Sequence, residues 1–135
     1  MNGCSGYKFK KEERLTGKKS IDLLFKIGIH INKFPIRVIF NIVYDDLQKY
    51  PAKVLFGISK KKFKRAVKRN LIKRRMREAY RLNKNLLYTI LNDKKKKIHI
   101  AFIYEGTDIT DFKTIEQLIK EIFIEISKRL SEITI

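Results

Sequence analysis

Hydrophobic residues occur along this chain in two patterns, a helical spacing and short runs typical of strands, and each pattern predicts one kind of element. Spacings of three and four residues, which place side chains on one face of a helix, occupy three stretches. The predicted helices cover residues 18–27, about 64–87 and 112–126. Gly28 is placed to end the first helix, and Thr110 or Asp111 can offer a side-chain oxygen to the N-terminus of the last.

Runs rich in β-branched and aromatic residues predict strands between these helices. The predicted strands cover residues 34–44, 52–59 and 98–104. We expect the first two to pair antiparallel, because only a short loop joins them. The third is apolar on both sides and is therefore expected in the centre of the sheet. The pattern predicts one mixed sheet with helices packed on it, without an internal repeat.

The middle helix is predicted to have two faces. An apolar face, expected to pack on the core, contains Ile72, Met76, Ala79, Tyr80 and Leu87. A polar face, with residues again three and four apart, contains Asn70, Lys73, Arg74, Arg77 and Arg81. Residues 60–84 include thirteen Lys or Arg but a single acid, Glu78. Solvated helix faces normally alternate acids with bases, because like-charged pairs are destabilising, so we interpret this face as a binding surface for a polyanion.

The composition narrows the identity of that polyanion. The 135 residues have a formal net charge of +18, an excess that a bound polyanion would neutralise. No apolar run reaches the roughly 18–20 residues of a membrane-spanning helix, and the first residues do not resemble a secretory signal. Cys4 stands alone, which fits a reducing compartment. We therefore expect a nucleic-acid partner, no membrane partner and a cytoplasmic location.

The acidic and histidine side chains do not form a recognisable catalytic set. Asp45 and Asp46 are adjacent in a predicted loop, an arrangement more typical of a turn than of a two-metal nuclease. His30 and His99 are far apart in the sequence, and with one cysteine they do not predict a zinc site. We predict no catalytic and no metal-ligating residues in the protein. A stand-alone nuclease that uses Asp45 or Asp46 remains an alternative.

A second binding surface depends on which sheet face stays open. We expect Ile21, Phe25 and Ile39 to be core residues unless the sheet face opposite the last helix is exposed to solvent. In that case an apolar floor with Arg37 and Asn41 at its rim is suited to stacking single-stranded bases.

Residues 60–81 resemble the signature of the bacterial ribonuclease P protein subunit. The matching motifs are Lys61-Lys62, Ala66-Val67, Arg69-Asn70, Ile72-Lys73-Arg74 and Arg77-Glu78-Ala79-Tyr80. The chain departs from the pattern at Leu71, where the family usually has a further Arg, and Lys68 or Arg75 is expected to replace that contact. Arg14-Leu15, the helix ending at residues 24–28 and Gly57-Ile58-Ser59 also resemble the family.

The resemblance implies an α+β fold, a small two-layer α/β sandwich. It implies a four-stranded sheet and three helices in the order αβββαβα. The basic helix would join the third and fourth strands by a left-handed crossover, an exception to the usual right-handed rule. Only the first dozen residues lie outside the resemblance. We therefore expect a flexible basic N-terminal arm over residues 1–13 and a single RNA-binding α/β domain over residues 14–135.

The function implied is that of the protein component of ribonuclease P, which assists removal of the 5′ leader from precursor tRNA. The chemistry would reside in the RNA subunit, with Mg²⁺ held mainly by RNA. The partners implied are that RNA and precursor tRNA, with no protein partner required. A ribosomal or ribosome-associated basic RNA-binding protein is the alternative.

The resemblance also implies two sets of site residues. Expected contacts to RNA are Lys61, Lys62, Lys64, Arg65, Lys68, Arg69, Asn70, Lys73, Arg74, Arg77 and Arg81. The expected cleft for the 5′ leader is formed by Ile21, Phe25, Arg37, Ile39 and Asn41.

Overall fold

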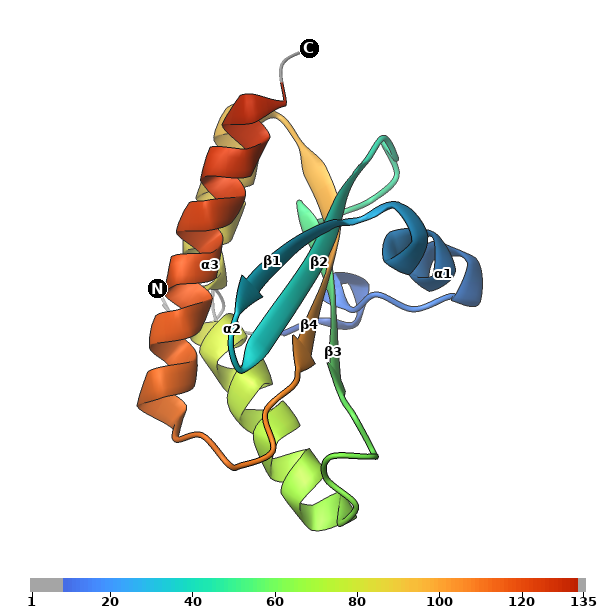
Figure 1. Ribbon diagram of the computed structural model, residues 1–135. Coiled ribbons are helices and arrows are strands. Elements are labelled where there is room, and N and C mark those ends of the chain that lie inside the picture. Colours follow the sequence, from blue (N-terminus) through green and yellow to red (C-terminus); the bar gives the residue numbers. More distant parts are fainter. Residues whose placement is uncertain (1–8, 134–135) are drawn as a thin grey trace.

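The computed structural model describes residues 9–133 and contains one four-stranded sheet and three α-helices. A short 3₁₀ turn (Lys11–Glu13) precedes them. The elements are α1 (Lys18–Ile27), β1 (Ile29–Lys33), β2 (Ile36–Val43), β3 (Ala52–Ile58), α2 (Ala66–Lys94), β4 (Lys97–Tyr104) and α3 (Phe112–Glu132). The fold is the α+β arrangement implied by the resemblance (Figure 1).

The strands lie in the order β1-β2-β4-β3. Antiparallel pairing joins β1 to β2 and β2 to β4, whereas β3 is parallel to β4. The predicted antiparallel pairing of residues 34–44 with residues 52–59 is therefore wrong, because β4 lies between these two segments. β4 is buried along most of its length, so the central position predicted for it is confirmed. The 29-residue helix α2 provides the long connection that a parallel pair requires.

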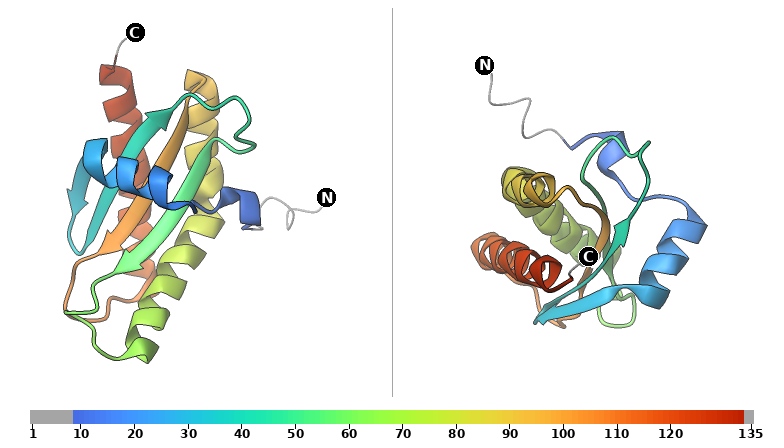
Figure 2. Two further views of the ribbon diagram at one scale, coloured as in Figure 1. Left: turned by 90° about the vertical axis from the view of Figure 1, so that its right-hand side faces the viewer. Right: turned by 90° about the horizontal axis from the view of Figure 1, so that it is seen from above.

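The connection from β3 through α2 to β4 is left-handed. Figure 2 (left) shows β3 and β4 running downward side by side, with α2 behind the sheet and β4 to the left of β3. Most β-strand crossovers have the opposite hand. The left-handed crossover implied by the resemblance is therefore present.

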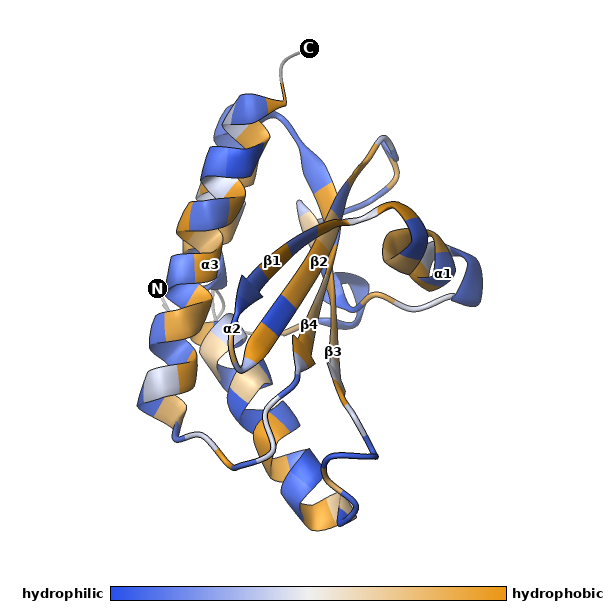
Figure 3. Cartoon of the chain, viewed as in Figure 1, coloured by the Kyte–Doolittle hydropathy of each residue, from blue (hydrophilic) through white to orange (hydrophobic). Residues whose placement is uncertain are grey.

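Helices α2 and α3 cover one face of the sheet, and α1 lies across the other (Figures 1 and 2). The larger core fills the space between the sheet and the helix pair, where the Tyr80 ring packs edge-on against Phe102 at 5.7 Å and Phe123 at 6.1 Å. All five residues of the predicted apolar face of the middle helix are fully buried. In Figure 3 the strands are predominantly apolar, whereas α2 and α3 combine apolar and polar residues, as amphipathic helices do.

The second face of the sheet is only partly covered. Leu24 of α1 packs with Ile39 and Ala101 in a small buried cluster. Gly28 allows this close approach, because a Cβ atom there would lie 2.3 Å from the Cγ2 atom of Ile39. The rest of this face, toward β3, remains open to solvent in the described residues.

Several predicted boundaries change. β1 was not apparent from the residue pattern, because its five residues lie directly after α1 and include three polar side chains. α2 extends to Lys94, beyond the end expected near residue 87, and stops at Lys95, which adopts a left-handed φ of 55°. Asp111 occupies the N-cap position of α3 without a side-chain capping bond.

Residues 9–13 belong to the folded domain, which corrects the expected arm over residues 1–13. The Glu13 side chain is fully buried and its carboxylate lies 2.6 Å from the Lys84 ammonium. The Tyr88 hydroxyl donates a hydrogen bond to the same carboxylate oxygen. This buried pair explains the difference, since departure of the segment would remove the Glu13 carboxylate from the buried Lys84 ammonium. Residues 1–8 lie outside the described residues.

None of the helices within residues 9–133 combines the length and the hydropathy needed to cross a bilayer.

Candidate nucleic-acid interface

The basic segment occupies the N-terminal half of α2 and the loop before it. Figure 1 shows this half of the helix extending past the end of the sheet. Phe63, which is buried and packs against Tyr104 with ring centroids 5.9 Å apart, fixes the loop to the core. Exposed residues on both sides of this anchor are Lys61, Lys62, Lys64, Arg65, Lys68, Asn70, Arg74 and Arg77.

Most of these cations have no acidic partner. Within residues 9–133, no carboxylate forms an ion pair with Lys61, Lys64, Arg65, Lys68, Lys73, Arg74 or Arg77. Positive charge that the protein does not neutralise is the electrostatic signature of a phosphate-binding surface. Apart from Arg81, the charged residues of the predicted polar face are therefore available to an external anion.

Three predicted RNA-binding residues have intramolecular roles. The Lys62 ammonium donates a hydrogen bond of 2.5 Å to the carbonyl oxygen of Glu105. Arg81 forms a two-pronged ion pair with Glu78, with N–O distances of 2.6 and 3.0 Å, and this hydrogen bonding lowers the pKa of the Glu78 carboxyl. Arg69 donates hydrogen bonds of 2.7 Å to the carbonyl oxygens of Phe63 and Lys64, and so holds the loop against the start of α2. All three residues can still contact phosphate, but part of their donor capacity is already used.

Arg75 was one of two residues expected to replace the missing basic residue at position 71. Its guanidinium donates instead to the carbonyl oxygen of Thr110, at 2.7 Å, and so links α2 to the loop before α3. Lys68 is exposed and has no such bond. The geometry therefore favours Lys68 over Arg75 for a contact near Leu71.

An open groove lies on the sheet face beside α1. Its volume is about 460 Å³, and its floor is formed by Leu55, Gly57 and Ile103 of the adjacent strands β3 and β4. Phe25 of α1, whose exposed fraction is 41%, forms one wall. Lys62, from the basic segment, also lines the groove.

The structure places only part of the predicted leader cleft in this groove. Phe25 and Arg37 line it, and Ile21 packs beside the small cluster under α1. Ile39 is fully buried and Asn41 is 7% exposed, so neither offers its side chain to the groove. The physical reason is the position of α1, which packs on β2 and leaves the floor to β3 and β4. The Oδ1 atom of Asn41 has no hydrogen-bond partner among the described residues.

Arg37 lines the groove with its charge partly neutralised. Its Nε atom donates to the Glu105 carboxylate at 2.8 Å, and its Nη1 atom lies 3.2 Å from the Nδ1 atom of His30. These contacts fix the guanidinium at the rim. They also reduce its value as a phosphate ligand compared with the unpaired cations of α2.

The floor residues of the groove did not emerge from the sequence. Strand alternation places Leu55 and Gly57 on the same face of β3, and the parallel register sets Gly57 opposite Ile103. A glycine inside a strand often marks a place where a ligand or backbone approaches closely, so Gly57 was a usable signal. Identifying the face, however, required knowing that β3 borders β4.

The acidic residues do not form a metal centre. Among the described residues, no three His, Cys, Asp or Glu side chains lie close enough together to hold a metal ion. Asp45 accepts a hydrogen bond of 3.0 Å from the backbone N–H of Leu47, as expected for a turn.

The likeness to known proteins agrees with this geometry. A family model described as Ribonuclease P matches residues 9–127. The ribonuclease P protein component of Porphyromonas gingivalis (strain ATCC 33277) is 35% identical over 127 residues, which cover 94% of this chain and 92% of the relative. The corresponding protein of Chlorobium phaeobacteroides is 32% identical, with 99% of this chain and 97% of the relative covered.

Solved structures show the same fold at lower identity. The ribonuclease P protein of Thermotoga maritima superposes with a TM-score of 0.65 at 24% identity, over 84% of this chain and 96% of that one. The protein of Staphylococcus aureus gives a TM-score of 0.64 at 19% identity, over 86% and 95%. The family match spans both the basic helix and the groove, and it decides against the ribosomal alternative. The chain therefore belongs to the ribonuclease P protein family, the protein components of an endoribonuclease complex that includes an RNA subunit.

Proposed function

We propose that this chain binds the RNA subunit of ribonuclease P through the basic face of α2 and holds the 5′ leader of precursor tRNA in the sheet groove. The observation that supports the proposal is the continuity of the two surfaces. Lys62 belongs to the basic segment and also lines the groove that Phe25 borders. A leader is single-stranded, and an apolar floor next to unpaired cations suits exposed bases and their phosphates.

Under this proposal the bond cleavage belongs to the RNA subunit, and Mg²⁺ is held mainly by RNA. The protein contributes cations that neutralise phosphates, which allows two polyanions to approach each other. Six to ten phosphate contacts would suffice for an affinity that depends steeply on salt. The partners are the RNA subunit and precursor tRNA, without a further protein, and the site of action is the bacterial cytoplasm, where tRNA is made.

Reconstitution tests the proposal directly. The purified chain is combined with a bacterial ribonuclease P RNA and precursor tRNA at low Mg²⁺ concentration, and release of the 5′ leader is measured. We expect the protein to accelerate cleavage relative to the RNA alone. An unchanged rate would refute the proposal. Cleavage by the protein without any RNA subunit would favour the nuclease alternative that uses Asp45 or Asp46.

A further inference from the structure

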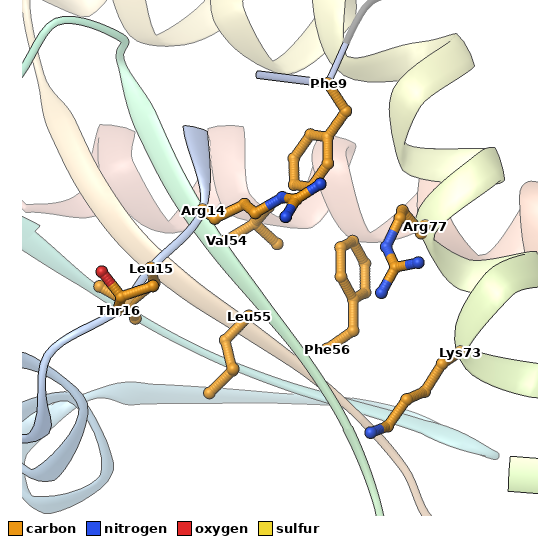
Figure 4. A pocket seen from close by; sticks show the side chains of 9 residues that line it. All are labelled: Phe9, Arg14, Leu15, Thr16, Val54, Leu55, Phe56, Lys73 and Arg77. Carbon is orange, nitrogen blue, oxygen red and sulfur yellow. The ribbon is translucent and has the colours of Figure 1, made fainter. Parts of the chain in front are cut away.

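A second cavity lies on the other side of β3, between that strand, α2 and the segment before α1. Its volume is about 260 Å³. Figure 4 shows Arg14 entering from the N-terminal segment, with Lys73 and Arg77 entering from α2 across the Phe56 ring. Three cations from two distant parts of the sequence thus line one cavity.

The three cations are not neutralised by the protein. Within residues 9–133, no carboxylate forms an ion pair with Arg14, Lys73 or Arg77. The Arg14 guanidinium lies over the Phe9 ring, 5.4 Å from its centroid, which orients it without removing its charge. Like charges that line one cavity repel one another, so an anion bound there would relieve that repulsion.

The segment that contains Arg14 is held on both sides. The preceding residue, Glu13, forms the buried ion pair with Lys84 and also accepts a 2.7 Å hydrogen bond from the backbone N–H of Lys10. The following residue, Leu15, is buried and donates a 2.9 Å backbone hydrogen bond to the carbonyl oxygen of Val54 in β3. These anchors fix the backbone of Arg14 at the mouth of the cavity.

We propose that this cavity binds a phosphodiester group of single-stranded RNA, and that Glu13 and Lys84 are positioning residues that hold Arg14 as its third cation. The ligand class follows from the lining. The cations match a phosphate, and the partly exposed rings of Phe9 and Phe56 give the adjoining base an aromatic surface. The inference rests on the proposed function and extends it to a site outside the groove.

The first experiment replaces Arg14 by glutamine, which removes the charge and keeps most of the length. Affinity is measured across a range of about 50–200 mM salt in two arms. One arm uses ribonuclease P RNA alone. The other uses the assembled holoenzyme with precursor tRNA, compared with mature tRNA that lacks the leader. The matched control is Lys113→Gln, which removes one exposed cation on α3, away from the cavity.

In the titration whose RNA contains the bound phosphodiester, we expect Arg14→Gln to weaken binding about tenfold. The salt slope should become shallower by about one unit. The titration that shows this loss identifies whether the bound phosphodiester belongs to the RNA subunit or to the leader. If Arg14→Gln matches Lys113→Gln in both arms, the cavity does not bind RNA. Wild-type protein must first accelerate leader removal, and a failure there counts against the proposed function rather than against this cavity.

A second variant tests the positioning role. Glu13→Ala combined with Lys84→Met removes the anchor without leaving a buried charge unpaired. We expect the same loss of one slope unit, and no further loss when Arg14→Gln is added, because the two changes act on one contact. A full Arg14→Gln effect in the anchor-free protein would overturn the positioning role.

An NMR titration of the wild-type protein tests the same contact without a variant, and so it applies even if the variants fold poorly. The Arg14 side-chain Nε–Hε resonance should shift when ribonuclease P RNA or a leader oligonucleotide is added. Arg129, which is paired with Glu125 on α3, serves as the internal reference and should stay in place. A stationary Arg14 signal with both RNAs would refute the proposal.

Discussion

Basic residues of α2 that look equivalent in the sequence differ in what they already touch. Arg74 is exposed and has no ion pair or side-chain hydrogen bond in the described residues. Arg81, two turns later, is paired with Glu78, and Arg69 holds the loop before the helix. The contribution of each to RNA binding should therefore differ, because a guanidinium engaged with its own protein gains less from a phosphate.

Replacing Arg74 by alanine should weaken binding of ribonuclease P RNA without unfolding the protein. The expected change is a salt slope shallower by about one unit, which corresponds to the loss of one phosphate contact. The measurement is affinity at several salt concentrations, with thermal unfolding as the check on folding. Arg129→Ala on α3 is the control, and an unchanged slope for Arg74→Ala would show that this side chain does not touch phosphate.

His99 should make stability depend on pH. Burial lowers the pKa of its imidazole, and the neighbouring charge of Lys53 acts in the same direction. The unfolded chain, with a pKa near 6.5, therefore binds the proton more tightly than the folded protein. The stability gained from a neutral His99 is present above about pH 6.5 and is lost as the pH falls below it.

The test compares wild type with His99→Gln, which retains a polar group near Gln48. Urea unfolding at about pH 7.5 and about pH 5.5 should show a larger loss of stability on acidification in wild type than in the variant. Equal losses would mean that other groups dominate the pH dependence.

At the scale of elements, the position of α1 decides what the open sheet face can bind. The helix packs on β2 through Leu24 and covers Ile39, which leaves the floor of the groove to β3 and β4. Phe25, on the neighbouring side of the same helix, becomes the wall of that groove.

Phe25→Ala should reduce the affinity of the holoenzyme for precursor tRNA more than its affinity for mature tRNA. Loss of one aromatic stacking contact corresponds to about 1–3 kcal/mol. Leu23→Ala is the matched control, because Leu23 is an exposed apolar residue of the same helix that does not line the groove. Similar losses for both tRNAs, or for both variants, would contradict a leader-binding role.

Gly28→Ala should destabilise the contact between α1 and β2. The added methyl group would lie 2.3 Å from Ile39 Cγ2 and 2.4 Å from the carbonyl oxygen of Leu24, so backbone must move. Overpacking of this kind costs about 1–3 kcal/mol. Urea unfolding gives the free energy directly, and Gly17→Ala is not a suitable control because Gly17 has a φ of 96°. Stability equal to wild type would show that α1 can shift without cost.

At the scale of the whole molecule, the charges are distributed unevenly. The net charge is +18, and unpaired cations gather on α2 and its preceding loop, whereas Glu116, Glu121 and Glu125 lie on α3. Self-repulsion of this kind is a cost that RNA removes on binding. The free protein and the complex should therefore respond to salt in opposite directions.

Added KCl should raise the melting temperature of the free protein, because the screening length falls from about 10 Å at 0.1 M to about 3 Å at 1 M. The same salt should weaken RNA binding, by about 10³–10⁵ between 50 and 200 mM if six to ten phosphates are contacted. Calorimetry of the free chain and a binding titration measure the two effects. A melting temperature that stays constant or falls with KCl would show that self-repulsion is not significant in the folded state.

Particular residues show how far the sequence could be interpreted. The apolar face of α2 was predictable, because burial of one helix face spaces apolar residues three and four apart. The central position of β4 was predictable, because a strand buried on both faces is apolar at consecutive positions. The neighbour of β3 in the sheet was not predictable, since the side-chain pattern of residues 52–59 fits equally well beside β2 or beside β4. Glu13 was predicted to belong to the flexible arm because its ion-pair partner, Lys84, is 71 residues away in the sequence.

The sequence by itself determined that a row of basic residues lies along one side of a helix whose other side is buried. Helical geometry and hydrophobicity act locally, so they can be read from neighbouring residues. Only the tertiary structure decided which cations are neutralised, which sheet face stays open and that Arg14 joins Lys73 and Arg77. These features depend on distances between side chains far apart along the chain, and those distances are set by how the whole core packs.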